Sequence, residues 1–260
     1  MKNWKSSADS PEMAGRQYHI QCAKGDVAPF VILPGDPART DEIAATWEES
    51  RFIAQNREHR TFTGKTGGAP VSVTSSGMGS PAAAIAIEEL LRVGAKTIIR
   101  LGTCGAIQPG INCGDIIINT ACVRHDGASD TYVEPAYPAS ADIYVTMALI
   151  EACKKLGIRY HVGVGCSTAS FHCGQGRPGF NGYGQSFFEN IVDDMRRANV
   201  LNFEMEAAIL FTLSNLYGFR SGALCVVVAN RITNEMTSAP LLPAIKTANA
   251  AIQSLYSASI

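Results

Sequence analysis

The sequence predicts an α/β fold, in which helices cover both faces of a β-sheet. Short apolar, β-branched runs that end in Gly, Asp or Asn alternate with longer stretches of helical character. The runs are almost continuously apolar, as expected of strands that are buried on both faces. The 260 residues suffice for one large core. We therefore expect one domain over residues 18–260, preceded by a solvated tail over residues 1–17.

Six runs have the composition of buried strands. In chain order they contain the sequences FVIL, PVSVT, TIIRL, DIII, HVGVG and ALCVVVA. They correspond to residues 30–36, 70–79, 96–106, 114–123, 160–170 and 223–231. Because ligands of such sheets bind beyond the carboxyl ends of the strands, we expect the site at these ends.

Four stretches between and after these strands have helical character. They cover residues 81–94, 140–157, 204–218 and 240–259. The first begins with Pro81 and ends with Gly94, which is the usual asymmetry of helix ends. The second begins with Ser and Asp, carries two lysines in its last turn and ends with Gly157. The glycine-rich segment over residues 174–184 is the least regular part of the chain and is a candidate lid.

The composition argues against several classes of function. A hydrophobic content of 46% and a charged content of 17% are those of an ordinary globular protein. A net charge of −1 gives no support for binding to nucleic acid or to an acidic membrane surface. No apolar run approaches the ~20 residues of a membrane-spanning helix. The first fifteen residues lack the apolar core of a secretory signal. We expect neither nucleic acid nor membrane as a partner.

The eight cysteines show no metal-binding or disulfide pattern. They are scattered, no CxxC occurs, and several lie inside apolar runs where a free buried thiol is usual. His172 and Cys173 are adjacent in a loop, where two side chains rarely bind one ion. We therefore predict no metal site of this kind and a reducing, cytoplasmic location.

The segment Phe171–Arg177, FHCGQGR, has the side chains that a uracil ring requires. The amide of Gln175 offers one acceptor and two donors, and Arg177 offers donors only. Together they match a ring edge that presents a carbonyl, an N–H and a second carbonyl. Phe171 can stack on the ring. On its own the pattern has little specificity, since many surface loops contain Gln, Gly and Arg.

Two segments have features of anion sites. PGDPAR at 34–39 ends a strand and opens a helix, with Gly35 allowing close approach of the backbone and Arg39 on the first turn. On local grounds alone, a capped helix with a solvated arginine is the favoured interpretation of this segment. Arg100 ends an apolar strand and is followed by Gly102 and Thr103, which suits bidentate binding of phosphate. The alternative for Arg100 is pairing with an internal carboxylate.

Two further segments are ambiguous on local grounds. Glu206 can accept hydrogen bonds from two vicinal hydroxyls, and Met205 offers an apolar surface to a furanose ring. The helix dipole alone, however, favours acids in a first turn. The run Arg57–Arg60, REHR, is expected to be a solvated edge.

Taken together, eight segments resemble the nucleoside phosphorylase superfamily, in its uridine phosphorylase branch. They are PGDPAR at 34–39, NRE at 56–58, SSGMG at 75–79, RLGTCGAIQPGINCGD at 100–115, RHDGAS at 124–129, FHCGQGR at 171–177, EMEAA at 204–208 and ANR at 229–231. Collinear agreement in so many segments is more specific than any one of them. The resemblance implies a single domain whose central mixed sheet is partly barrel-like and is flanked by helices.

The resemblance also implies the role of each matching residue. Phosphate would be held by Gly35, Arg39, Arg100 and Thr103, with Arg57 supplied by a neighbouring subunit. Ribose would be held by Met205 and Glu206, with His19 reaching across the interface to the 5′-hydroxyl. Uracil would be held by Phe171, Gln175 and Arg177, beside Cys104. The groups expected to act in catalysis are Arg100, Gln175, Arg177 and Glu206.

The implied activity is the reversible phosphorolysis of uridine to uracil and ribose 1-phosphate, in pyrimidine salvage. Inorganic phosphate is then a co-substrate and no cofactor is needed, although some relatives bind a monovalent cation near Glu58 and Ser75. The implied assembly is a dimer with shared active sites, usually built into a hexamer. The alternatives are a purine nucleoside phosphorylase, a nucleosidase that uses water, and a silent nucleoside-binding relative. Cys104 stands where many members of the uridine branch carry Thr.

Overall fold

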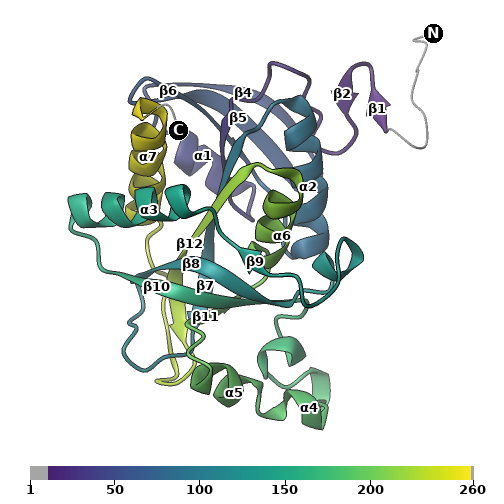
Figure 1. Ribbon diagram of the computed structural model, residues 1–260, viewed down its shortest axis with the longest axis vertical. Helices are drawn as coiled ribbons and strands as arrows, with labels where there is room; N and C mark the ends of the chain where they lie inside the picture. Colours follow the sequence, from purple (N-terminus) through teal and green to yellow (C-terminus); the bar gives the residue numbers. More distant parts are fainter. Residues whose placement is uncertain (1–10, 259–260) are drawn as a thin grey trace.

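The computed structural model describes residues 11–258, in which helices lie on both sides of a large mixed sheet (Figure 1). The strands are β1 (Glu12–Met13), β2 (Arg16–Gln17), β3 (Phe30–Leu33), β4 (Glu49–Asn56), β5 (His59–Thr66), β6 (Ala69–Thr74), β7 (Thr97–Ala106), β8 (Ile116–His125), β9 (Ala139–Ser140), β10 (Tyr160–Thr168), β11 (Asn202–Glu204), β12 (Arg220–Asn230) and β13 (Glu235–Met236). The α-helices are α1 (Ala38–Ala44), α2 (Ser80–Val93), α3 (Ile143–Leu156), α4 (Ser186–Glu189), α5 (Ile191–Arg197), α6 (Ala207–Tyr217) and α7 (Leu242–Ser257). Short 3₁₀ turns are η1 (Ser129–Thr131), η2 (Cys173–Gln175) and η3 (Phe180–Gly182).

Five strands close into a barrel at the centre of the sheet. Following hydrogen-bonded neighbours, the ring runs β7, β12, β8, β10, β11 and back to β7. β12 pairs with β7 in parallel but with β8 antiparallel, so the barrel is mixed. From β7 the sheet continues outward through β3, β6, β5 and β4. The predicted α/β class, with a mixed and partly barrel-like sheet, is confirmed.

Four of the helices form two layers, each with its own apolar core. On one side α3 and α7 lie together, and residues such as Leu149 and Ile252 join the buried cluster beneath them (Figure 1). On the other side α2 and α6 pack against each other, with Leu90 and Phe211 fully buried. Burial of a large aliphatic or aromatic side chain stabilises the fold by about 1.5–3 kcal/mol, so these two clusters hold the helices on the sheet.

The predicted ends of two helices are confirmed. α2 has Pro81 in its first turn and Gly94 as its C-cap. In α3 the Asp142 carboxylate accepts a hydrogen bond from the Val145 N–H, and Gly157 ends the helix with a φ of +64°. The left-handed conformation at this last position favours glycine.

The predicted helix over residues 204–218 starts later than the sequence indicates. Residues Asn202–Glu204 form β11, and α6 begins only at Ala207. The Glu204 carboxylate accepts hydrogen bonds from the N–H groups of Glu206 and Ala207, both at 2.8 Å. Glu204 therefore caps the helix from outside it.

The expectation of a solvated edge at Arg57–Arg60 holds for Arg57, which is exposed, but is wrong for His59, which is buried. These residues join β4 and β5, an antiparallel hairpin that sequence periodicity did not identify. His59 is buried, with 1% of its surface exposed, because β5 lies between β4 and β6. Arg57 lies in the turn with a φ of +52°, a conformation that only a few per cent of residues other than glycine adopt.

The first part of the chain differs from the expected solvated tail. Of the predicted tail over residues 1–17, the first ten residues lie outside the described residues. Residues Glu12–Met13 and Arg16–Gln17 pair as a small antiparallel hairpin, and Gln17 is buried. The side-chain amide of Gln17 donates to Glu12 at 2.9 Å, which helps to order this segment.

Two other expectations concern thiols and membranes. All eight cysteines are free and six are buried, as expected of thiols inside apolar runs. Within residues 11–258, no helix is both long enough and apolar enough to cross a bilayer.

Candidate functional site

A cavity of about 780 Å³ lies where the loops after β3 and β6 meet the ends of β7, β11 and β12. Ten of the twelve residues assigned to substrates in the sequence line it. They are Gly35, Arg39, Arg100, Thr103, Cys104, Phe171, Gln175, Arg177, Met205 and Glu206. The other two, His19 and Arg57, do not. A larger open hollow of about 940 Å³, at the start of β7 and β12, has none of the predicted residues in its lining.

Arg100 lies at the centre of the cavity wall and is held by two carboxylates. Its Nε donates to Glu204 at 2.9 Å, and its Nη2 pairs with Glu206. The residue is only 4% exposed. Its Nη1 is buried with no hydrogen-bond partner in the described part of the chain. The internal pairing considered for Arg100 is therefore present, and one donor of the guanidinium still lacks a partner.

Gly102 makes room for this guanidinium. A Cβ built on Gly102 would lie 2.8 Å from Arg100 Nη2 and 3.2 Å from Cys225 Sγ. Real Cβ atoms do not approach other atoms so closely, and a packed core cannot yield freely. The glycine in RLGTCG is thus required by the position of the Arg100 side chain.

Glu204 is a functional residue that sequence reasoning missed. Besides capping α6 and pairing with Arg100, its carboxylate accepts a hydrogen bond from Ser167 Oγ. It lines the cavity together with Glu206. The signal that could have identified it is Arg100 itself, because an arginine at the end of a buried strand requires a counter-charge.

The electrostatics of this cluster follow from burial and from proximity. Burial raises the pKa of Glu206, and the neighbouring Glu204 raises it further, although Arg100 opposes both effects. For Arg100, burial lowers the pKa, but Glu206 and Glu204 outweigh it and the net shift is upward. The guanidinium therefore stays charged, and the ionised form of Glu206 depends on Arg100.

The cavity wall at Gly35 and Gly77 consists of two loops joined by backbone hydrogen bonds. Gly77 N donates to Gly35 O at 3.0 Å, and Ser76 N donates to Pro34 O at 2.8 Å. A Cβ on Gly35 would lie 3.3 Å from Gly77 O, so this position favours glycine. The predicted cap is present in part, since Asp36 Oδ1 accepts from Ala38 N at 2.9 Å while Pro37 occupies the cap position.

Met205 and Glu206 are fixed by Gly79 and Ser80, at the start of α2. Gly79 N donates to Glu206 Oε1, and Ser80 Oγ donates to Met205 O at 2.8 Å. Glu206 is only 4% exposed. The wall therefore presents a buried carboxylate beside a thioether, on a backbone that two elements hold in place.

The loop over residues 171–177, which we call the base loop after its predicted role, is ordered by its own side chains. Arg177 Nη1 donates to Phe171 O and to Gln175 Oε1, both at 2.6 Å. The Arg177 guanidinium lies 4.0 Å from the centre of the Phe171 ring. Gln175 Nε2 donates to Thr168 Oγ1 at 3.0 Å, which fixes the orientation of the amide. The loop thus presents an amide, a guanidinium and an aromatic ring as one unit.

A second arginine, directly after β12, supports this loop. Arg231 Nη1 donates to Gln175 O at 2.8 Å. Burial first, and then the nearby charge of Arg231, lowers the pKa of Arg177 to about 10. From the sequence, Arg231 is only the last residue of the motif ANR, and no role is predicted for it. Its position is set by the tertiary structure, because β12 and the base loop are distant in the chain.

The side chains expected near a monovalent cation do not face the cavity together. Glu58 lines the cavity, but Ser75 is fully buried beside the hairpin. Ser75 Oγ donates to Glu58 O at 2.6 Å and accepts from Arg60 N at 2.8 Å. Within the described residues, no group of three or more His, Cys, Asp or Glu is placed to hold a metal ion.

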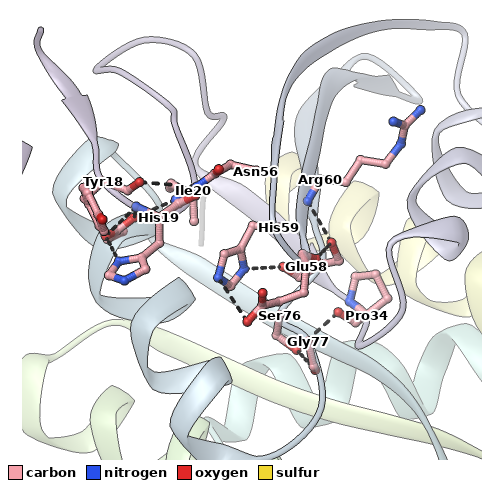
Figure 2. A network of polar contacts seen from close by, with 12 residues as sticks. Tyr18, His19, Ile20, Pro34, Asn56, Glu58, His59, Arg60, Ser76 and Gly77 are labelled. Carbon is pink, nitrogen blue, oxygen red and sulfur yellow. Dashed lines mark hydrogen bonds and ion pairs between the residues drawn. The ribbon is translucent and has the colours of Figure 1, made fainter. Parts of the chain in front are cut away.

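The two predicted residues outside the cavity lie close to each other. The Arg57 guanidinium is 5.8 Å from the centre of the Tyr18 ring, and this ring packs edge-on against His19 at 4.9 Å. Asn56 Nδ2 donates to His19 O at 2.8 Å (Figure 2). We call Tyr18, His19 and Arg57 the outlying patch.

Comparison with known proteins gives a consistent result. A family model described as the phosphorylase superfamily matches residues 29–260. The chain is 56% identical over 250 residues to the uridine phosphorylase of Thermococcus kodakarensis, covering 96% of this chain and 90% of the relative. It is 40% identical over 225 residues to the uridine phosphorylase of Escherichia coli K12, covering 85% and 89%. It is 37% identical over 224 residues to the guanosine phosphorylase of Halorubrum lacusprofundi, covering 86% and 88%.

Proposed function

The chain belongs to the phosphorylase superfamily, and we propose that it is a uridine phosphorylase, a pentosyltransferase that converts uridine and phosphate to uracil and ribose 1-phosphate. The observation that carries this proposal is the lining of one cavity by ten residues from separate segments. They supply what an anion, a sugar and a pyrimidine each require. The relatives named uridine phosphorylase match almost the whole chain, which supports the same activity.

Phosphate binds between Arg100, Arg39 and Thr103, with backbone at Gly35. The unpartnered Arg100 Nη1 supports this placement, because a buried guanidinium donor is costly to leave without an acceptor. Arginine and phosphate form short, charge-assisted hydrogen bonds. In this position phosphate is directed toward the sugar beside Glu206.

Ribose binds against Met205, with its vicinal hydroxyls on Glu206. Phosphate attacks C1′ while the bond from C1′ to uracil N1 breaks, so positive charge develops on the sugar in an oxocarbenium-like state. The phosphate anion on one face stabilises that charge. Because Glu206 and Arg100 are held rigidly, they need little reorganisation as the reaction proceeds.

Uracil binds at the base loop, where Gln175 and Arg177 stabilise the negative charge that the leaving base acquires. The Gln175 amide is already oriented by Thr168 and Arg177. Cys104 lies in the same cavity, where burial first, and then Cys225, raises the pKa of its thiol. A neutral thiol at this position contributes shape and packing to the base site.

The base preference follows from the last core strand. Purine-specific relatives are expected to place an Asp after it, to protonate the leaving purine, whereas this chain has Asn230. Asn230 donates to Gln108 O and Ile111 O and accepts from Ile232 N. All of these hydrogen bonds of the Asn230 side-chain amide are thus made with backbone groups. This arrangement favours a pyrimidine.

A purine nucleoside phosphorylase is the second candidate. Two observations favour it: Cys104 in the base site and the 37% identity to a guanosine phosphorylase. The base loop and the higher identity to uridine phosphorylases favour the first candidate.

We further propose that active sites are shared within a dimer, which is built into a hexamer. His19 and Arg57 do not line their own chain's cavity, yet they lie together on the surface. The outlying patch of one copy would complete the cavity of the next, with Arg57 on phosphate and His19 on the ribose 5′-hydroxyl. This arrangement explains why a strained turn carries an exposed arginine.

Release of the free base is the direct test. Absorbance is followed with uridine, inosine or guanosine, each with and without inorganic phosphate. We expect phosphate-dependent release of uracil and much slower reaction of both purine nucleosides. Release without phosphate would indicate a nucleosidase, and preference for a purine would indicate the second candidate. Binding of uridine without turnover would indicate a silent relative.

A further inference from the structure

We propose that Glu89 is a positioning residue of the reaction, which holds His19 of the outlying patch in the orientation that a neighbouring active site uses. The inference rests on the proposed function, since it concerns the residue that contacts the ribose 5′-hydroxyl across the interface. Glu89 lies on α2, outside the cavity lining, and none of the sequence motifs includes it.

The Glu89 carboxylate is used almost entirely by residues 19 and 20. His19 N donates to both of its oxygens, at 3.1 and 3.0 Å, and Ile20 N donates to Oε2 at 2.8 Å. His19 Nδ1 lies 2.7 Å from Oε1. Two backbone donors and one ring donor therefore converge on a single side chain.

Glu89 occupies a position that would otherwise favour an apolar residue. It is 4% exposed, on the face of α2 that buries Ala86 and Leu90 against the core. A buried carboxylate is costly unless hydrogen bonds compensate for lost hydration. Here these hydrogen bonds come from the His19 segment. The burial of the Glu89 carboxylate therefore depends on the position of the histidine.

The contact also determines which ring nitrogen of His19 faces outward. A carboxylate only accepts hydrogen bonds, so Nδ1 carries the proton that points toward Glu89. Nε2 is then left for a ligand. The His19 ring remains partly exposed, with 23% of its side-chain surface accessible.

A second contact holds the same segment from β4. Asn56 Nδ2 donates to His19 O at 2.8 Å and to Tyr18 O at 3.4 Å (Figure 2). Asn56 directly precedes Arg57 in the turn. The histidine and the arginine that a neighbouring site would receive are therefore connected, with Glu89 fixing the ring and Asn56 fixing the backbone.

The test compares uridine with 5′-deoxyuridine, which lacks the hydroxyl assigned to His19. We expect Glu89→Ala to lower kcat/KM for uridine by about tenfold or more, as for loss of hydrogen bonds to a charged group. The same variant should change kcat/KM for 5′-deoxyuridine by less than about twofold. Glu88→Ala is the matched control, because Glu88 is the neighbouring acid of α2 and bonds to Tyr217 instead. It should leave both substrates unaffected.

A double variant separates positioning from general stabilisation. If Glu89 acts through His19, then Glu89→Ala with His19→Ala loses no more than His19→Ala alone. Equal loss for both substrates, or additive losses in the double variant, would overturn the proposal. If Glu89→Ala does not fold, Glu89→Gln replaces it. The glutamine keeps an oxygen for the backbone donors but presents an N–H to Nδ1, and the same discrimination is expected.

The outcomes also separate this proposal from the proposed function. Wild-type protein that does not release uracil from uridine would overturn both. If His19→Ala affects the two substrates equally, the role of His19 is wrong, and the role of Glu89 is overturned with it. If His19→Ala discriminates between them but neither variant of Glu89 does, only the positioning proposal is overturned.

Discussion

The Arg100 cluster and the outlying patch each contain an arginine that we propose binds phosphate, but the fold holds the two side chains in opposite ways. Arg100 is buried, pairs with Glu204 and Glu206, and shares Glu204 with the start of α6. Arg57 is exposed in a two-residue turn and contacts the face of a tyrosine ring. Arg100 is therefore part of the buried structure that forms the cavity, whereas Arg57 lies on the surface of the fold.

This difference predicts how stability and activity are coupled. When a paired, buried charge is removed, its partners are left uncompensated, and folding and catalysis suffer together. When an exposed charge is removed, the fold loses little. Substitutions in the two regions should therefore separate effects on activity from effects on stability.

The largest effect is expected for Arg100→Ala. We expect kcat/KM for uridine to fall by about a thousandfold or more, since an oriented donor to the reacting anion is lost. Stability should fall by about 3–5 kcal/mol, because Glu204 and Glu206 remain buried without their counter-charge. Denaturant unfolding measures the second quantity. Arg92→Ala, which removes an exposed arginine from α2, is the control and should change stability by less than about 0.5 kcal/mol. An Arg100→Ala variant that is as stable as the wild type would contradict the coupling of stability and activity at this residue.

Arg177→Ala tests why activity and stability are coupled at Arg100. Arg177 also lines the cavity but is only half-buried, so this variant shows whether the coupling arises from burial or from a position in the cavity. We expect kcat to fall by about 10²–10³, because the developing charge on uracil loses its donor. The melting temperature should change by less than about 2 °C, since this arginine is only half-buried and its contacts lie within its own loop. Steady-state kinetics and a thermal melt measure the two effects. A large loss of stability would show that the base loop belongs to the rigid part of the fold. Arg197→Ala is the control for the loss of one positive charge.

The outlying patch is tested by mixing two inactive variants. Arg57→Ala should lower kcat/KM about a hundredfold through loss of a phosphate contact, with an unchanged denaturation curve. Mixing it with Glu206→Gln during refolding should restore activity to about a quarter of the wild-type value, because half of the dimers are mixed and half of their sites are intact. A mixture that stays inactive would contradict shared sites. Separate refolding followed by mixing serves as the control.

The smallest effect concerns pH. The pKa of Glu206 is raised in the fold, mainly by burial and then by Glu204, from an ordinary value of 4.5. A raised carboxyl pKa contributes stability that is fully present below pH 4.5 and is lost as the pH rises through the folded-state pKa. We therefore expect the melting temperature of the wild-type protein to fall relative to that of Glu206→Gln as the pH rises through this range. Arg57→Ala should follow the wild-type curve, and parallel curves for wild type and Glu206→Gln would refute the expectation.

Much of the architecture could be predicted because it depends on local pattern. The six apolar runs are strands and the ends of α2 and α3 follow the usual capping residues. The hairpin of β4 and β5 was missed, since its residues are mostly polar and gain their strand structure by pairing with β6. The predicted helix begins at Glu204, although Glu204 belongs to the short strand Asn202–Glu204 that closes the barrel there.

The sequence by itself determined the family of this protein and most of the side chains that line its cavity. The motifs predict an anion site, a sugar site and a base site, because side-chain type and local spacing limit what can be bound. Only the tertiary structure decided which charges are shared. It placed Glu204 against Arg100, Arg231 against Gln175 and Glu89 against His19. Each of these contacts joins elements that are distant in the chain. The physical reason is that the energy of a buried charge depends on what surrounds it, and no pattern along the chain contains that information.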